Sequence, residues 1–172
     1  MLPIETARLT LIPATVELAR AELYDGGAFS QLLNAEVPGE WPPETLVDAL
    51  PLFIGWLEAA PDCVGWYGWY ALLRSEGGDR PILIGGGGFL GPPEKGTVQT
   101  GYSVLPAFQR QGYATELVTA LIDWAFGQGD VTSIAAETEW ANPASVRVFE
   151  KTGFQSVGPT SEPGGMRFER RR

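Results

Sequence analysis

The sequence of 172 residues contains no histidine and a single cysteine, Cys63. Without histidine, a Ser-His-Asp triad, a Cys-His pair, a histidine metal ligand and a histidine general base are all excluded. Cys63 has no partner for an internal disulfide and no cationic neighbour in the sequence to activate its thiol. This is typical of a packed or loop cysteine in a reducing compartment, so we expect a cytoplasmic protein without a metal centre.

Basic residues and long apolar runs are also scarce. Lysine and arginine number 12 against 21 aspartates and glutamates, which gives a net charge of -9 and argues against a nucleic-acid partner. No apolar run is long enough to span a bilayer, and the N-terminus lacks the basic and apolar regions of a secretory signal. A hydrophobic content of 44% supports a packed core, and the length suits one domain over residues 1–172.

The apolar periodicity predicts an α+β fold, with one mixed, mostly antiparallel sheet flanked by helices. The expected strands cover residues 9–12, 66–74, 81–89, 97–104, 132–138, 154–157 and 166–170. The expected helices cover residues 15–24 and 43–60, the second broken or kinked at Pro51, and two more begin after residues 112 and 142. Turn sequences join the strands between residues 66 and 104 into an antiparallel meander, and residues 26–43, rich in glycine, proline and acidic groups, read as a loop.

A glycine-rich run, GGGGFLG at residues 85–91, imitates the dinucleotide-binding pattern G-x-G-x-x-G. That pattern needs a helix next, whereas PPEKG offers a turn. The glycines indicate a strand bulge, or a floor where a substrate lies against backbone. The aromatic cluster of residues 66–70 is better explained as a strand with one core face than as a base-stacking platform.

The segment GYSVLPAFQRQGYAT, residues 101–115, runs from a strand through a turn into an amphipathic helix. The first turn of a helix has unpaired backbone N–H groups and the positive end of the helix dipole, so it attracts phosphates. Gly112 and Ala114 leave room for a bulky anion, and Thr115 can add a hydroxyl. The segment therefore predicts a phosphate-binding helix start.

A second helix start follows in ETEWANPASVRVFEKTGF, residues 137–154. Asn142 is its expected N-cap, followed by a proline at the first helical position, and a glycine stands where the helix should end. Ser145 and Phe149 share the face of Asn142 because three- and four-residue steps stack side chains. Glu137 ends the preceding strand and should arrive near the same helix start.

Together these residues resemble the GNAT N-acetyltransferases. The run QRQGYA is similar to the family's coenzyme A loop, Q/R-x-x-G-x-G/A, and NPAS with EKTGF is similar to its later asparagine helix, in the same order. The opening IETARLTLIP and the helix LVTALIDWAF resemble the branch that includes ribosomal-protein alanine and serine N-acetyltransferases. The resemblance implies transfer of an acetyl group from acetyl-CoA to a primary amine by direct attack in a ternary complex. The acceptor would be a small molecule or a protein N-terminus, and the protein a monomer or homodimer.

The resemblance also implies roles for individual residues. The strand residues Tyr102, Ser103 and Val104 would pair with the pantetheine arm, and their N–H groups would polarise the acetyl carbonyl. Asn142 would hold a pantetheine amide, and Ser145 would bind the sulfur or relay a proton, although capping its own helix is an equal alternative. The pyrophosphate would lie on the backbone of Arg110, Gln111, Gly112, Tyr113, Ala114 and Thr115.

The amine must be neutral to attack, and a positioned carboxylate that takes its proton is worth about 10²–10⁴-fold in rate. Glu137 is the candidate base, since some family members keep a catalytic glutamate five residues before the asparagine. Glu139 is its competitor on the same side of the strand, and a merely structural role is the alternative. Many relatives have a further glutamate where this sequence has Gln99, which cannot act as a base.

The family's frequent proton donor to the leaving thiolate is a tyrosine at the position of Phe149. Ser145 is therefore the candidate, with Tyr102 and Tyr113 as further possibilities. The departures at positions 99 and 149 leave open a non-catalytic acyl-CoA-binding module, and a nucleotide-binding protein is the second alternative. Acidic residues near Trp41 would form a wall for a cationic amine or peptide N-terminus; they are Glu36, Glu40, Glu44 and Asp48. A protein N-terminus, a polyamine, an aminoglycoside and a small amino compound all remain open as acceptors.

Overall fold

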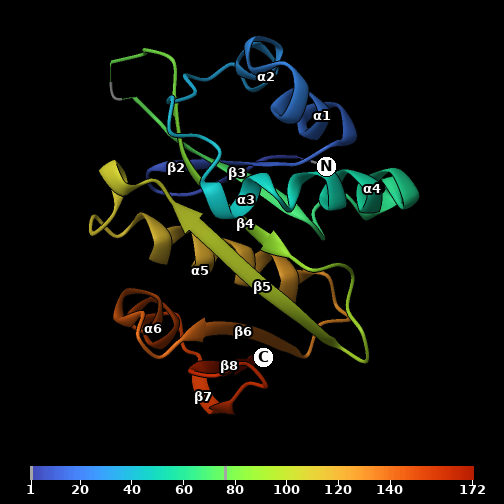
Figure 1. Cartoon of the computed structure of the whole chain (residues 1–172), viewed down its shortest axis with the longest axis vertical. Coiled ribbons are helices and arrows are strands. Elements are labelled where there is room, and N and C mark those ends of the chain that lie inside the picture. Colours follow the sequence, from blue (N-terminus) through green and yellow to red (C-terminus); the bar gives the residue numbers. More distant parts are fainter. Residues whose placement is uncertain (1, 76) are drawn as a thin grey trace.

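Eight strands form one mixed sheet in the computed structural model, which describes residues 2–75 and 77–172 and the side chains of all of these except 44 and 45. The strand order is β1-β2-β3-β4-β5-β6-β8-β7 (Figure 1). The strands are β1 (Ile4–Glu5), β2 (Leu9–Pro13), β3 (Gly68–Leu73), β4 (Ile82–Phe89), β5 (Thr97–Val104), β6 (Ser133–Glu139), β7 (Gln155–Pro159) and β8 (Gly165–Arg171). Neighbouring strands run antiparallel except β5 and β6, which are parallel. The predicted α+β class and the antiparallel meander are confirmed.

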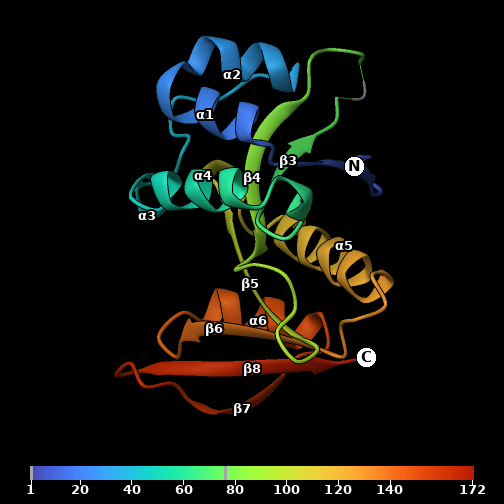
Figure 2. The same cartoon turned by 90° about the vertical axis from the view of Figure 1, so that its right-hand side faces the viewer.

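Helices cover both faces of the sheet (Figure 2). One face carries α1 (Val16–Tyr24), α2 (Gly26–Leu33), α3 (Glu44–Val47) and α4 (Leu50–Ala59). The other carries α5 (Tyr113–Gly127) and α6 (Pro143–Lys151). A separate apolar core fills each interface, one centred on Phe29 and Leu57 and the other on Trp69 and Leu121. The sheet is therefore the middle layer of three.

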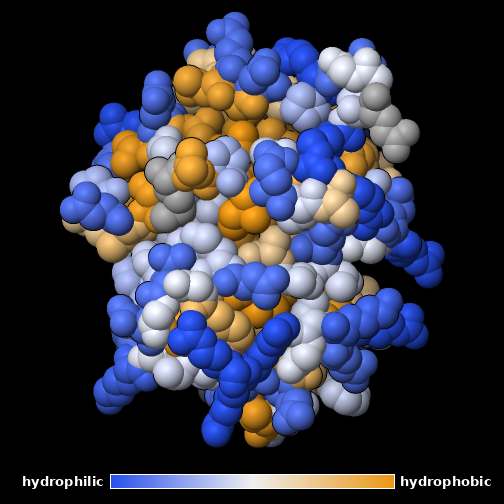
Figure 3. Space-filling model, turned by 180° about the vertical axis from the view of Figure 1, so that it is seen from behind, coloured by the Kyte–Doolittle hydropathy of each residue, from blue (hydrophilic) through white to orange (hydrophobic). Residues whose placement is uncertain are grey.

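Hydrophobic and hydrophilic side chains are unevenly spread over the back of the molecule (Figure 3). Hydrophilic side chains cover most of the lower part, where β7 and β8 lie, and hydrophobic ones gather in the upper part. The pattern agrees with a sheet whose C-terminal hairpin borders solvent, because four of the five residues of β7 are exposed and the fifth is half-buried.

The helix α2 lies where the sequence indicated a loop. Asp25 caps it by accepting a hydrogen bond from the backbone N–H of Ala28, 3.0 Å away, and Phe29 and Leu33 bury its inner face. Two glycines at its start conceal a helix that tertiary burial stabilises. The prediction of a loop over residues 26–43 is therefore wrong for its first part.

The expected break in the second helix is present, but it lies just before Pro51 and not at that residue. Pro43 precedes α3 as predicted, but α3 ends at Val47, and Pro51 stands in the first turn of α4. A proline costs nothing there because the first N–H groups of a helix have no intrahelical partner. The chain turns before this proline and not at it.

The glycine run of β4 follows a bulge. Opposite Ala71 and Leu72 of β3 stand Gly85 and Leu83, so Ile84 is the extra residue. A Cβ on Gly85 would lie 2.4 Å from the Ser103 carbonyl oxygen, too close for any side chain. The predicted bulge is confirmed, and the glycines let β4 lie tightly between its neighbours.

The two parallel strands diverge halfway along β5. Their pairing runs from Thr97 opposite Ser133 to Thr100 opposite Ala136 and ends there. Beyond that point β5 continues against β4, while β6 continues against β8. Residues 101–104 of β5 therefore present one backbone edge to an opening in the middle of the sheet, visible in Figure 1 as the gap that widens toward α6.

Candidate active site

A cleft lies where β5 leaves β6, with a volume of about 700 Å³. Gln109 donates a hydrogen bond of 2.8 Å from its side-chain amide to the Val104 carbonyl, which fastens the loop after β5 to the strand. The structure brings two sequence motifs together here, because the lining includes the predicted residues Tyr102, Ser103, Val104, Arg110, Gly112, Ala114, Thr115, Asn142 and Ser145.

The loop before α5 has a backbone suited to an anion. Arg110 and Gly112 both adopt the left-handed region, with φ of 62° and 86°, a conformation that turns successive N–H groups toward a concave surface. Gly112 is the N-cap of α5 and supplies no side-chain cap, whereas Thr15 and Asp25 cap their helices by side-chain hydrogen bonds. The first N–H groups of α5 are thus left for a ligand.

Three cationic side chains line the same cleft. Arg110 comes from the loop, and Arg147 and Lys151 come from successive turns of α6. In a protein of net charge -9, this local concentration of positive charge favours an anionic ligand. The sequence interpretation missed Arg147 and Lys151, although their spacing of four residues on a predicted helix placed them on one face.

A second group of residues holds this loop from behind. Glu116, in the first turn of α5, accepts hydrogen bonds from the Thr6 hydroxyl at 2.6 Å and from the Arg8 backbone N–H at 2.7 Å. The Arg8 guanidinium also donates to the Glu116 carboxylate at 2.7 Å and to the Gln111 carbonyl at 2.9 Å. Burial alone would raise the pKa of Glu116, but these hydrogen bonds and the Arg8 charge lower it overall.

Gln111 and Tyr113 both contact Arg8, which lies behind the loop. The Arg8 guanidinium lies over the Tyr113 ring, 4.3 Å from its centre, and neither residue belongs to the lining of the cleft among the described residues. Their predicted contribution to the pyrophosphate loop is therefore one of backbone position.

At the other wall, Asn142 caps α6 as predicted. Its side-chain carbonyl accepts from the Ser145 N–H at 3.2 Å, and the cap leaves the NH₂ group of Asn142 for another partner. The Ser145 hydroxyl is hydrogen-bonded to the Tyr102 hydroxyl at 3.0 Å. The Tyr102 ring in turn meets the buried Phe149 ring edge-on, with centres 5.9 Å apart. Phe149 thus supports the tyrosine that carries a hydroxyl into the cleft.

Burial raises the pKa of Tyr102 above its ordinary value, and the hydrogen bond with Ser145 partly offsets the rise. The phenol is therefore protonated throughout the neutral pH range. It can donate a hydrogen bond through the Ser145 hydroxyl to a group bound in the cleft.

Glu137 lies apart from Ser145. Its neighbour Ala136 packs in the core beneath α5 and α6, so Glu137 and Glu139 project from the opposite face of β6. Glu137 forms an ion pair with Arg167 on β8, 2.9 Å apart. Neither glutamate belongs to the lining of this cleft among the described residues. Its role as general base stays a prediction.

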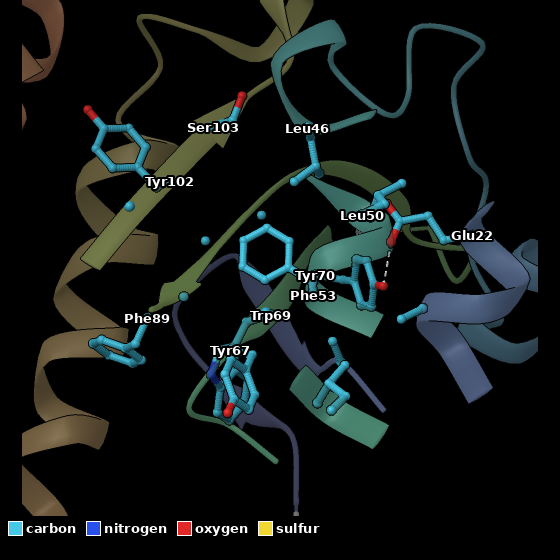
Figure 4. A pocket seen from close by; sticks show the side chains of 18 of the residues that line it. Glu22, Leu46, Leu50, Phe53, Tyr67, Trp69, Tyr70, Phe89, Tyr102 and Ser103 are labelled. Carbon is cyan, nitrogen blue, oxygen red and sulfur yellow. Dashed lines mark hydrogen bonds between the residues drawn. The ribbon is translucent and has the colours of Figure 1, made fainter. Parts of the chain in front are cut away.

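A smaller cavity of about 240 Å³ lies on the opposite face of the sheet, between β3–β5 and helices α1, α3 and α4 (Figure 4). Tyr102 and Ser103 border both this cavity and the cleft. The two spaces therefore border the same two residues of β5, just beyond its last pairing with β6.

One carboxyl group lies in this smaller cavity. Glu22 of α1 accepts hydrogen bonds from the Tyr70 hydroxyl at 2.6 Å and from the Trp41 indole N–H at 2.8 Å, one on each oxygen. Burial raises the pKa of Glu22, and the two hydrogen bonds offset part of that rise. Burial and the adjacent Glu22 raise the pKa of Tyr70 well above its usual value.

The sequence model described as "Acetyltransferase (GNAT) domain" matches residues 8–155. The chain belongs to the GNAT acetyltransferase family. The resemblance drawn from the two motifs is confirmed, and with it the assignment as an acyltransferase enzyme.

Relatives of this GNAT protein extend over nearly its whole length. An uncharacterized N-acetyltransferase, YjdG, of Bacillus subtilis (strain 168) is 32% identical over 155 residues, 90% of each chain. A ribosomal-protein-S5-alanine acetyltransferase from Vibrio fischeri has the same fold, with a TM-score of 0.66 at 16% identity, over 99% of this chain and 97% of the other. The aminoglycoside acetyltransferase AAC(6')-Ib, solved with ribostamycin and coenzyme A, gives a TM-score of 0.63 at 22% identity, over 96% and 94% of the two chains.

The expected acidic wall of this GNAT protein is placed differently from its prediction. Trp41 does border the smaller cavity, but Glu36, Glu40 and Asp48 are exposed and lie outside its lining. The side chain of Glu44 lies outside the described part of the chain. No sequence motif marked Glu22, yet it is the carboxyl group that the fold brings into the cavity. Its partner Tyr70 on β3 is 48 residues away in the sequence, so their contact appears only in the folded chain.

The sequence predicts no segment that spans a bilayer. Within residues 2–75 and 77–172, no helix of this GNAT protein is both long and apolar enough to cross a membrane.

Proposed function

We propose that this GNAT protein transfers the acetyl group of acetyl-CoA to a primary amine within a ternary complex. The observation that carries the proposal is that both cavities border Tyr102 and Ser103. A donor bound in the cleft and an acceptor bound in the smaller cavity approach each other there from opposite faces of the sheet. Holding two reactants in such a geometry supplies a large part of the rate enhancement.

The residues of the cleft suit the chemistry of coenzyme A. The N–H groups at the start of α5, together with Arg110, Arg147 and Lys151, match a pyrophosphate and further phosphate. The backbone edge of residues 101–104 matches the two amides of an extended pantetheine arm, and the side-chain NH₂ of Asn142 matches one of their carbonyls. Acetyl-CoA supplies an activated thioester when bound, and the N–H groups of this β5 edge can stabilise negative charge on its acetyl oxygen.

Proton transfer involves two sets of residues in this proposal. On the sulfur side, the Tyr102 hydroxyl donates through Ser145 to the departing thiolate, in place of the tyrosine that Phe149 replaces. On the amine side, Glu137 takes the proton through water, since Gln99 cannot act as a base and Glu137 lies outside the cavity lining.

A panel of primary amines with acetyl-CoA, followed by release of free thiol, tests the proposal. We expect turnover with at least one amine and a thermal shift with coenzyme A that exceeds the shifts with ATP and NAD. A larger shift with either nucleotide would contradict the proposal in favour of a nucleotide-binding protein.

The departures at Gln99 and Phe149 favour one second candidate, a non-catalytic acyl-CoA-binding module of the same fold. Tight binding of acetyl-CoA without thiol release for any amine would support that module and refute the transferase.

A further inference from the structure

The floor of the smaller cavity is bare backbone. Gly88 of β4 stands directly opposite Gly68 of β3 on one side and opposite Gly101 of β5 on the other. Three strands thus contribute a continuous row without side chains. In the next row of the same face, Gly86 lies between Tyr70 and Ser103. A Cβ on Gly88 would meet the Tyr67 carbonyl, and one on Gly86 would meet the Trp41 ring, whereas a Cβ on Gly101 would meet no atom within 4 Å. The open part of this floor therefore lies at Gly101, beside Ser103.

The walls and roof above this floor are apolar. Leu46 of α3 and Leu50 and Phe53 of α4 line the cavity together with Tyr67 and Tyr70 (Figure 4). Leu57 of α4 and Trp41 also belong to its lining. Among the described lining residues, Glu22 alone carries an ionisable carboxyl group. A flat glycine floor under an apolar roof forms a slot with few polar partners for a ligand.

We propose that the amine acceptor is a compact primary amine on an apolar body, such as a single aromatic ring or a short branched chain, which lies against Gly101 and presents its nitrogen at Ser103. The proposal rests on the acetyltransferase function proposed above and names the class of its acceptor. It differs from the cationic amine or peptide terminus that the acidic residues near Trp41 suggested.

Size and desolvation both favour this class. The cavity volume of about 240 Å³ is below the range of about 300–1,000 Å³ for drug-sized ligands. A polycation of several sugar rings is too large, and each of its buried hydroxyl and ammonium groups would need a partner that this lining does not offer.

Glu22 holds two walls of the slot in position. Each of its oxygens accepts one hydrogen bond, one from the Tyr70 hydroxyl and the other from the Trp41 indole N–H. The same desolvation that raises the pKa of Glu22 disfavours a charged amine and so lowers the pKa of an amine bound there. The slot therefore raises the fraction of the acceptor amine that is neutral and reactive. This matters because Gln99 stands where many relatives have a glutamate that could take the proton.

The first experiment compares kcat/KM for 2-phenylethylamine and 3-methylbutylamine with the values for spermidine, kanamycin and a peptide beginning with alanine. We expect the two apolar amines to exceed the others by about 100-fold or more, since single methylenes in apolar pockets already discriminate by about 10–200-fold. Faster turnover of spermidine, kanamycin or the peptide would overturn the inference and leave the transferase function standing.

A binding measurement keeps the inference testable without turnover. With coenzyme A bound, 2-phenylethylamine should quench tryptophan fluorescence and raise the melting temperature, because Trp41 lines the slot. Absence of this binding, with coenzyme A still bound, would overturn the inference whatever the catalytic result.

The matched variants are Gly101→Val and Gly55→Val. A Cβ at either position meets no atom within 4 Å, but Gly101 opens into the slot, whereas Gly55 is exposed on α4. We expect Gly101→Val to raise KM for 2-phenylethylamine about tenfold or more, and Gly55→Val to leave KM within about twofold. An unchanged KM in Gly101→Val would show that the acceptor binds elsewhere.

Discussion

Replacing Glu116 by glutamine should loosen the loop assigned to the pyrophosphate without removing any group from the cleft. The carboxylate accepts three hydrogen bonds, two on one oxygen from Thr6 and the Arg8 N–H and one on the other from the Arg8 guanidinium. A glutamine retains the first two in neutral form. The NH₂ group of the new glutamine then faces the Arg8 guanidinium, so two hydrogen-bond donors oppose each other. Arg8 thereby loses the contact that positions it to donate to the Gln111 carbonyl.

The magnitude follows from these three bonds. Hydrogen bonds to a charged group contribute about 1.5–3 kcal/mol and neutral ones about 0.5–1.5 kcal/mol. The Glu116 side chain is 15% exposed but Arg8 is 43% exposed, so solvent reduces the loss at Arg8. We expect the free energy of unfolding to fall by about 2 kcal/mol, which lowers the melting temperature of a chain of this length by about 4–8 °C.

The function should change in the same direction. If the less ordered loop weakens binding of acetyl-CoA by about 1 kcal/mol, KM for acetyl-CoA rises about fivefold. We expect kcat to change less, because the residues proposed for proton transfer to sulfur lie on β5 and α6. Thermal melting and steady-state kinetics at pH 7 measure both effects. Glu17→Gln is the control, since Glu17 also stands in the first turn of a helix but is exposed, and it should lose only the dipole term of about 0.3–1 kcal/mol.

The pH dependence supplies the refutation. The folded protein lowers the pKa of Glu116 below its ordinary value of 4.5, so its stabilisation is complete above that pH and is lost as the pH falls through the lower, folded pKa. The difference between the native protein and Glu116→Gln should therefore shrink below about pH 4.5. A loss equal to that of Glu17→Gln, or one that persists unchanged in acid, would refute the reasoning.

Three further predictions concern proton transfer and the buried acid. Tyr102→Phe and Ser145→Ala should each lower kcat about tenfold or more with KM for acetyl-CoA nearly unchanged, and full activity in either would remove that residue from the sulfur side. Glu137→Gln should depress turnover most at low pH; a pH–rate profile identical to the native one would remove Glu137 from the mechanism. Glu22→Gln should flatten the pH dependence of stability, because the raised pKa of Glu22 makes the native protein lose stability as pH rises from 4.5 through the folded pKa. Urea unfolding between pH 4.5 and 8 measures this, and parallel curves for both proteins would contradict it.

The helices whose ends are marked by capping or terminating residues could be predicted from the sequence. Asn142 and Gly153 bracket α6 where expected, and Gly112 marks the start of α5. The helix α2 was not predicted, because its two opening glycines have poor helix propensity and its main stabilisation, burial of Phe29 and Leu33 against other elements, is not visible in the sequence.

The same division applies to the site. The cleft that we propose for the donor could be outlined because its residues stand in two short motifs, each of which includes a helix start. Glu22 and Tyr70 meet across 48 residues, and the pairing of Glu137 with Arg167 spans 30. No local pattern records such contacts, so the acceptor side of the molecule and the orientation of β6 emerge only from the fold.

The divergence of β5 from β6 also bears on how the protein avoids unwanted association. An unpaired strand edge ordinarily templates the strands of other chains. Here the edge is short, covers only residues 101–104, and lies inside the sheet between the start of α5 and α6. A narrow, extended chain can enter that gap, but a full peptide strand with side chains on both faces would collide with the helices. The gap that we propose for a pantetheine arm therefore also limits sheet-to-sheet association through this strand edge.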